Sequence, residues 1–223
     1  LFVDGEMAKV ELKDRFTNLC PQPLENLHIL SSEMLYRDGC PICIDEPKEQ
    51  KAIDEVLDHL EEKGKRAQLI ILDNLSTLRR GINENDNSET QKILDWLVSL
   101  RHKGYTVIVV HHAGKNGQQR GASILEVPMD FVIKLEQPEV KSYFDEGAKF
   151  ELSFDKVRGK RPNPDTMIVS LKSDYNNTLR FYSEKLENFI AKHYIILRFL
   201  KDKGVKTQRV ISKELGISLG TVS

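Results

Sequence analysis

The sequence predicts an α/β protein in which a mostly parallel sheet is followed by antiparallel strands and a small helical end. The apolar run at residues 69–72 is typical of a strand that is buried on both faces, and residues 106–110 form the strongest strand pattern in the chain. Segments with a helical spacing of apolar residues alternate with them, and this rhythm is that of a doubly wound sheet. Helical patterns alone follow residue 184. We therefore predict two domains, residues 1–183 and 184–223.

Composition limits the possible classes of protein. The 223 residues suffice for one large domain and a small one. A net charge of -1 gives no overall attraction to nucleic acid, so any contact with DNA must come from a local patch. No apolar run approaches the roughly 18 residues of a membrane span, and no signal peptide pattern occurs. The 3 cysteines fit a reducing compartment, so we expect a cytoplasmic protein without membrane contact.

Two further features qualify this picture. Cys40 and Cys43 form a lone C-x-x-C pair, which we interpret as two free thiols rather than a zinc site, because four ligands are not close together in the sequence. The chain opens inside an apparent strand and stops inside an apparent helix. We therefore expect a fragment of a longer protein.

The first strand, residues 1–7, ends in two acids around a glycine. Gly5 permits a sharp turn there. If this strand and the strand at 69–73 are parallel neighbours, Glu6 and Asp73 lie on the same edge of the sheet. A carboxylate beside a metal-bound phosphate can position and deprotonate a water. The alternative is a solvated turn acid.

The strand that ends at Asp73 is the centre of the predicted site. The segments before it are predicted, in chain order, as a short exposed helix at 9–16, a strand at 27–30, a loop at 36–50 and a helix at 51–63 that ends at Gly64. Ligands of α/β sheets bind at the carboxyl ends of parallel strands. Asp73 could hold Mg²⁺ against a nucleotide phosphate there, or it could simply cap the next turn.

A polar loop at 79–88 follows, and Ser88 is predicted to cap the next helix. The apolar face of this helix consists of Ile93, Leu94, Leu97 and Leu100. Trp96 is expected to pack beside that face, with stacking on a nucleobase as the lesser alternative.

His111 and His112 come directly after the strand at 106–110. Adjacent side chains on an extended strand point to opposite sides. We therefore expect one of the two histidines to face the crevice and donate a hydrogen bond to phosphate, in preference to metal binding by both. A flexible polar loop at 116–123 follows, and it contains Arg120.

The strand at 131–135 is predicted to end the doubly wound, parallel part of the chain. The strands after it are predicted to be antiparallel. Beyond a hairpin-like loop at 136–147, they are a half-exposed strand at 150–154 and the strands at 167–171 and 179–182. Residues 155–162 carry four basic side chains and are predicted as a positive loop that includes Lys156 and Arg158. A solvated charge run is the alternative interpretation.

The C-terminal stretch is predicted to hold a helix from residue 184, a second helix opened by Thr207, and the start of a third. Three residues, the small Ser212, then Gly216 and Val222, have the spacing of a helix-turn-helix. This spacing predicts a winged-helix-like module. Ser218 and Thr221 would then face DNA. An ordinary three-helix cap is the alternative.

Together these stretches resemble the RecA-type ATPases of the RepA-like group, which are hexameric replicative helicases with many AAA-labelled relatives. The resemblance covers roughly residues 1–182 and is carried by Val3-Asp-Gly-Glu-Met7, Leu69-Ile-Ile-Leu-Asp-Asn-Leu75, His111-His-Ala-Gly-Lys115 with Arg120-Gly-Ala-Ser123, and Phe154-Asp-Lys-Val-Arg-Gly159. It implies a RecA-like core, ATP and Mg²⁺ as cofactors, and a homo-oligomeric ring such as a hexamer that acts on DNA in replication or in a mobile element.

The resemblance also implies roles for single residues. Glu6 matches the carboxylate that activates water, and Asp73 matches the Walker B acid that holds Mg²⁺. His112, with His111 beside it, matches the residue that senses the γ-phosphate. The residues that would reach a neighbouring subunit's nucleotide are Lys156 and Arg158, with Arg120 as a rival. Lys115 and Gln119 would contact DNA.

The sequence departs from the family pattern in two places. No Gly-x4-Gly-Lys-Ser/Thr loop occurs in these residues, and the family places that loop before the strand that starts at Leu1. Asp130 stands near the place of a family arginine, which weakens the assignment of the arginine that reaches the neighbour. Two alternatives stay open: a DNA-binding regulator gated by nucleotide without unwinding, and an interaction scaffold with a degenerate site.

Overall fold

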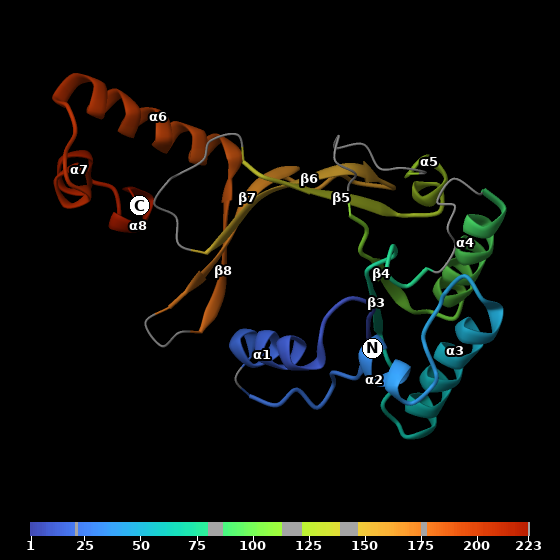
Figure 1. The fold of residues 1–223 in the computed structure, drawn as a ribbon. Coiled ribbons are helices and arrows are strands. Elements are labelled where there is room, and N and C mark those ends of the chain that lie inside the picture. The colour runs from blue at the N-terminus through green and yellow to red at the C-terminus, as the bar shows by residue number, and fades with distance from the viewer. Residues whose placement is uncertain (21, 80–86, 113–121, 139–146, 175–177, 223) are drawn as a thin grey trace. The chain divides into compact units, whose positions relative to one another are not determined.

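Figure 1 shows the fold in a computed structural model of the chain. The structure describes residues 1–20, 22–79, 87–112, 122–138, 147–174 and 178–222. The chain divides into two compact units, Leu1–Met129 and Asp130–Ser223. Each unit contains its own sheet.

The sheet of the first unit is parallel throughout, as predicted. Its strands, among the described residues, lie in the order β2-β1-β3-β4. Their bounds are β1 Phe2–Asp4, β2 Ile29–Ser31, β3 Leu69–Asp73 and β4 Thr106–Val109. Asp4 is the register partner of Asp73 on one side and of Ser31 on the other. The carboxyl ends of β1 and β3 therefore meet at one edge, as the predicted site requires.

Five helices accompany this sheet in the described part of the unit. They are α1 Lys9–Leu19, α2 Ser32–Arg37, α3 Pro47–Glu62, α4 Asn87–His102 and α5 Ala122–Glu126. The apolar faces of α3 and α4 join the buried side of β3 in one core that includes Leu57, Ile70, Leu72, Ile93 and Leu100. Full burial of one such side chain stabilises the fold by roughly 1.5–3 kcal/mol. Trp96 lies in this core, as predicted, and is 7% exposed.

The structure corrects several predicted boundaries in this unit. α3 begins at Pro47, inside the predicted loop, because proline suits the first turn of a helix, where its missing N–H is not needed. α4 begins at Asn87, so Ser88, which was predicted to precede this helix, lies within its bounds. The predicted loops at 36–50 and 116–123 overlap α2 and α5.

The two apolar strands are also less enclosed than their sequences predict. Leu69 is 38% exposed and Ile108 is 46% exposed, whereas Ile70 and Leu72 are fully buried. β4 is an edge strand of the sheet among the described residues. The expectation that the strand at 69–72 is buried on both faces is therefore wrong at Leu69.

The second unit contains an antiparallel sheet in the order β5-β6-β7-β8, which confirms the antiparallel strands predicted after residue 135. The strand at 131–135 was predicted to belong to the parallel part, and this is wrong, because β5 pairs antiparallel with β6. The bounds are β5 Phe131–Glu136, β6 Ala148–Val157, β7 Thr166–Ser173 and β8 Leu179–Lys185. β6 runs through residues 155–157, which were predicted as part of a positive loop. Lys156 pairs with Val132 of β5, and this pairing with the neighbouring strand extends β6 beyond what local composition indicates.

Three helices end the described chain, as predicted: α6 Leu186–Lys203, α7 Gln208–Leu215 and α8 Leu219–Val222. Gly216 ends α7 in the left-handed conformation, with φ of 62°. Its backbone N–H donates to the carbonyl of Ser212, whose hydroxyl donates to the carbonyl of Ile217 at 2.6 Å. The turn between α7 and α8 is thus a compact glycine-dependent corner.

The predicted division at residues 183 and 184 lies inside the second unit and stays a prediction. β8 ends at Lys185 and α6 begins at Leu186, so the division is close to the junction of these two elements. Among the described residues, no helix combines the length and the apolar character that crossing a bilayer requires.

Candidate functional site

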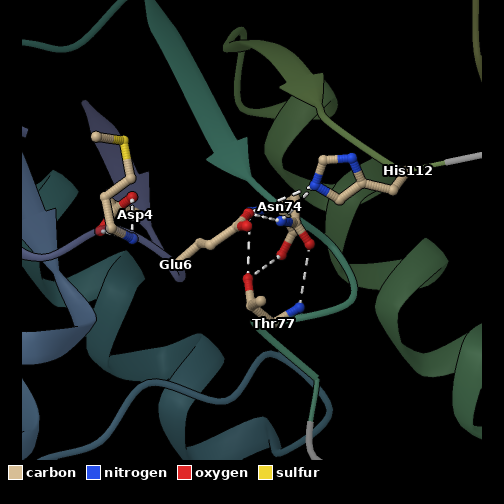
Figure 2. Close-up of polar contacts among 6 residues, drawn as sticks. Asp4, Glu6, Asn74, Thr77 and His112 are labelled. Carbon is tan, nitrogen blue, oxygen red and sulfur yellow. Dashed lines mark hydrogen bonds and ion pairs between the residues drawn. The ribbon is translucent and has the colours of Figure 1, made fainter. Parts of the chain in front are cut away.

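Polar side chains gather where β1, β3 and β4 end in the first unit. Glu6 follows β1, Asn74 follows Asp73 at the end of β3, and His112 comes shortly after β4. Figure 2 shows Glu6 and His112 converging on Asn74. The predicted residues Glu6, Asp73 and His112 therefore belong to the same edge of one sheet.

Close packing of two turns brings these strand ends together. The backbone N–H of Gly5 donates to the carbonyl of Asp73 at 2.7 Å. A Cβ on Gly5 would lie 2.5 Å from Thr77 Oγ1 and 2.9 Å from side-chain carbons of Leu78. Only glycine fits between the turn after β1 and the turn after β3, so this residue sets how closely Glu6 approaches Asn74.

Asn74 is the buried centre of the cluster, and it is 1% exposed. Its side-chain Oδ1 accepts a hydrogen bond from the backbone N–H of Thr77 at 3.2 Å. Its Nδ2 donates to Glu6 Oε2 and lies 3.0 Å from His112 Nε2. The peptide bond between Asp73 and Asn74 is cis. Every polar atom of this side chain thus has a partner within the site.

Glu6 and His112 face solvent above this buried amide. Their side chains are 54% and 65% exposed, and Glu6 Oε2 lies 3.4 Å from His112 Nε2. A cavity of about 750 Å³ opens beside Glu6. Its lining includes Met7, Glu33, Tyr36 and Ile42. A carboxylate in this position is accessible to water and to a ligand, which a proton-accepting group requires.

Asp4 is a second buried carboxylate at the same edge. It is fully buried, and its two oxygens accept from the backbone N–H of Met7 at 3.2 and 3.3 Å. Burial raises the pKa of Asp4 above its ordinary value, and the negative charges of Asp73 and Glu6 add to this effect. Asp4 therefore supports the turn that carries Glu6 from below, and it is not accessible to a ligand.

Asp73 is the residue with the chemistry of a metal ligand. It is half-buried at the end of β3. No group of three or more His, Cys, Asp or Glu side chains in the described part of the chain could hold a metal ion by itself. Mg²⁺ commonly binds through one or two carboxylates together with water and substrate phosphates. The donor set here fits a metal ion that arrives with a phosphate ligand.

His111 and His112 differ in their surroundings. His112 contacts Asn74 and Glu6, whereas His111 is half-buried and its Nδ1 has no hydrogen-bond partner within the described structure. His112 is thus the histidine that reaches the cluster, and the hydrogen bond to phosphate that was expected of one of the two stays a prediction.

The remaining predicted residues lie elsewhere. Lys115, Gln119 and Arg120 are outside the described residues. Lys156 lies in β6, and Arg158 follows it with its backbone N–H donating to Asp130 at 2.8 Å, both in the second unit. Ser218 is exposed before α8, and Thr221 lies in α8.

Sequence reasoning missed Asn74 and Asp4. An asparagine after a strand, such as Asn74, is usually interpreted as a turn residue. An acid beside a glycine, such as Asp4, is usually interpreted as a solvated side chain. The sequence does contain one indication of their role, because both lie close to Asp73 or Glu6 at the ends of two predicted strands. Their burial depends on the packing of Gly5, which local sequence does not reveal.

Comparison with known families places part of the chain in one family model. A family model described as an AAA domain matches residues 1–118. The matched stretch contains β1 to β4 and with them Glu6, Asp73, Asn74 and His112. A search of curated proteins finds none that matches the chain.

Proposed function

The chain belongs to the AAA domain family, whose model covers more than half of it, and on this basis we propose that it is the core of an ATP-hydrolysing, Mg²⁺-dependent motor that acts on DNA, of the RepA-like replicative helicase type. Family membership itself indicates a nucleotide-binding protein of the ATPase kind. The finer assignment to a motor on DNA is our proposal.

One observation carries the proposal: Glu6, Asn74 and His112 form a hydrogen-bonded cluster beside Asp73, at the carboxyl ends of three neighbouring parallel strands. Ligands of α/β sheets bind at this edge. A solvent-facing carboxylate next to a metal-binding carboxylate suits hydrolysis of a phosphate ester bond, because one can orient and deprotonate water while the other holds the cation.

We assign the roles as follows. Asp73 holds Mg²⁺, which neutralises charge on the phosphates when it is bound. Glu6 accepts the proton of the attacking water. His112 contacts the γ-phosphate and reports its presence to the DNA-binding part of the protein. In a ring, Lys156 and Arg158, or Arg120 in their place, supply positive charge to the nucleotide of the neighbouring subunit.

The helical end supports an action on DNA. α7 and α8 meet at the glycine corner of Gly216, and Ser218 is exposed directly after it. This is the arrangement in which the start of a following helix can approach DNA. We propose that Ser218 and Thr221 contact DNA through this helix start. We propose separately that Lys115 and Gln119 also contact DNA.

Removal of the carboxylate of Asp73 tests the nucleotide chemistry. In the full-length protein, Asp73→Asn should lower Mg²⁺-dependent phosphate release from ATP by about 10²-fold, because the cation loses its charged ligand. Asp95→Asn is the matched control, since Asp95 is exposed on α4. If Asp73→Asn and Asp95→Asn hydrolysed ATP at equal rates, Asp73 would not be a ligand of the catalytic cation, and the proposal would be contradicted.

A strand-displacement assay distinguishes a DNA motor from a DNA-binding regulator that is gated by nucleotide. The same helical end could bind DNA in either protein. ATP-driven displacement of a labelled strand supports the motor. DNA binding that changes with nucleotide but never displaces a strand supports the regulator.

A further inference from the structure

We propose that Asn74 is a positioning residue that holds the Glu6 carboxylate and the His112 imidazole in one hydrogen-bonded unit, and that it fixes His112 in the tautomer with its proton on Nδ1. The catalytic consequence rests on the proposed function, whereas the tautomer does not. Nothing in the sequence pattern or in the family match assigns a role to Asn74.

The orientation of the Asn74 amide is set from its own turn. Its Oδ1 accepts from the backbone N–H of Thr77 at 3.2 Å, and its backbone carbonyl accepts from the Thr77 hydroxyl and from the backbone N–H of Leu78, both at 3.1 Å. A carboxamide has one accepting oxygen and one donating nitrogen. With the oxygen committed to Thr77, Nδ2 must point toward Glu6 and His112, as Figure 2 shows.

The chemistry of Nδ2 then determines the state of His112. Nδ2 carries two protons and accepts none. One proton goes to Glu6 Oε2, and the other faces His112 Nε2 at 3.0 Å. An Nε2–H would instead have to donate to Glu6 Oε2, which is farther away at 3.4 Å. The shorter contact with Nδ2 therefore assigns Nε2 as the accepting nitrogen and places the ring proton on Nδ1. Because both Glu6 Oε2 and His112 Nε2 are acceptors, the amide between them makes the link.

This link matters because the two outer side chains are exposed. Glu6 and His112 are 54% and 65% exposed, so little packing restricts their rotamers. Asn74, which is 1% exposed, holds both from a rigid turn. A displacement of about 1 Å in a reacting group can cost about 10²-fold in rate. The amide thus sets the position of the water-activating carboxylate and couples it to the phosphate-sensing imidazole.

Two variants separate the donors of Asn74 from its volume. Asn74→Asp keeps the shape of the side chain and removes both N–H donors. Its carboxylate can only accept, so it favours an Nε2–H on His112 that donates to it. Asn74→Ala removes donors and volume together. Asn26→Ala is the matched control, because Asn26 is exposed outside the site.

The first readout is the ring-nitrogen NMR spectrum of ¹⁵N-histidine in the full chain, with the signals of His112 assigned by His112→Gln. We expect the Nδ1–H tautomer in the unaltered protein and a change to Nε2–H in Asn74→Asp. An Nε2–H tautomer in the unaltered protein, or no change in Asn74→Asp, overturns the proposal. This readout needs no ATP hydrolysis, so it decides the proposal even if the proposed function fails.

The second readout is kinetic and uses the full-length protein. Asn74→Asp should lower kcat by about 10²-fold while the Kd of a nonhydrolysable ATP analogue stays unchanged. A loss of turnover that is matched by an equal loss of nucleotide affinity contradicts a positioning role. If Asn74→Ala does not fold, Asn74→Asp, which keeps the side-chain volume, carries the test. If the unaltered protein does not turn over ATP, the proposed function fails and the NMR result stands by itself.

Discussion

At the scale of single residues, the site combines exposed reactive groups with buried groups that hold them. Glu6 and His112 face solvent, whereas Asn74 and Asp4 are buried below them. A buried amide with all of its hydrogen bonds satisfied stabilises a defined geometry, and a buried carboxylate adds a cost of desolvation. The two buried residues should therefore respond to substitution in opposite ways.

Asp4 gives a pH-dependent prediction. Its pKa is raised in the folded protein above the ordinary 3.8, chiefly by burial. At pH values between the ordinary pKa and the raised pKa, the folded state binds more protons than the unfolded state. The contribution of Asp4 to the free energy of unfolding therefore falls as pH rises through this range. Asp4→Asn keeps an acceptor oxygen for Met7. The variant should gain stability relative to the unaltered protein as pH rises above the ordinary pKa of 3.8.

Urea unfolding at several pH values measures this difference. Asp58→Asn, on the exposed side of α3, controls for the removal of a surface carboxylate. A difference between Asp4→Asn and the unaltered protein that stays constant with pH would show that burial does not disfavour the charge of Asp4.

How far the sequence predicts the site is also decided residue by residue. Glu6, Asp73 and His112 were predicted because each follows an apolar strand, and parallel strands place such residues at one edge. Asn74 and Asp4 were missed because their role depends on burial. That burial requires Gly5 to pack against Thr77 and Leu78, a contact between segments about 70 residues apart in the chain.

At the scale of elements, long apolar patterns were the most reliable signals. The strands at β3 and β4 and the helices α3 and α4 were predicted, since their apolar periodicity reflects burial. The short helices α2 and α5 were missed, because helices of a few residues are held by their surroundings and carry little local signal. β6 was predicted too short, because its last residues are charged and are held in the strand by pairing with β5.

The contact between α3 and α4 gives a prediction at this scale. Asp54 on α3 accepts from Trp96 Nε1 at 3.1 Å and from Lys103 Nζ at 2.6 Å. Asp54→Ala should lower the free energy of unfolding by about 1–3 kcal/mol, because the indole N–H, on a side chain that is 7% exposed, loses its partner. The change can be measured by chemical denaturation of the chain.

Lys103→Met is the matched control for this pair. Lys103 is 46% exposed, so its loss should cost less than about 1 kcal/mol. If the two variants were equally stable, the ion pair rather than the indole hydrogen bond would be the main contribution of Asp54.

At the scale of the whole molecule, the candidate chemistry is concentrated in the first unit. The family match covers residues 1–118, and all members of the described cluster lie within it. The second unit carries Lys156, Arg158 and the helical end. The proposed motor therefore needs contributions from both units. The nucleotide chemistry belongs to the first unit, and the proposed contacts with DNA and with a neighbouring subunit draw on residues of both.

The central claim is that Glu6 activates water for ATP hydrolysis, and a single-turnover measurement tests it most directly. In the full-length protein, Glu6→Gln keeps the shape of the side chain but removes its ability to accept a proton. Nucleotide and protein are mixed with protein in excess, and phosphate release is followed beside the Kd for ATP. Glu62→Gln, at the exposed end of α3, is the control.

We predict that Glu6→Gln binds ATP as the unaltered protein does and hydrolyses it about 10²–10⁴-fold more slowly, which is the range for loss of a general base. Hydrolysis at the rate of the Glu62→Gln control, with ATP bound equally well, would contradict the account.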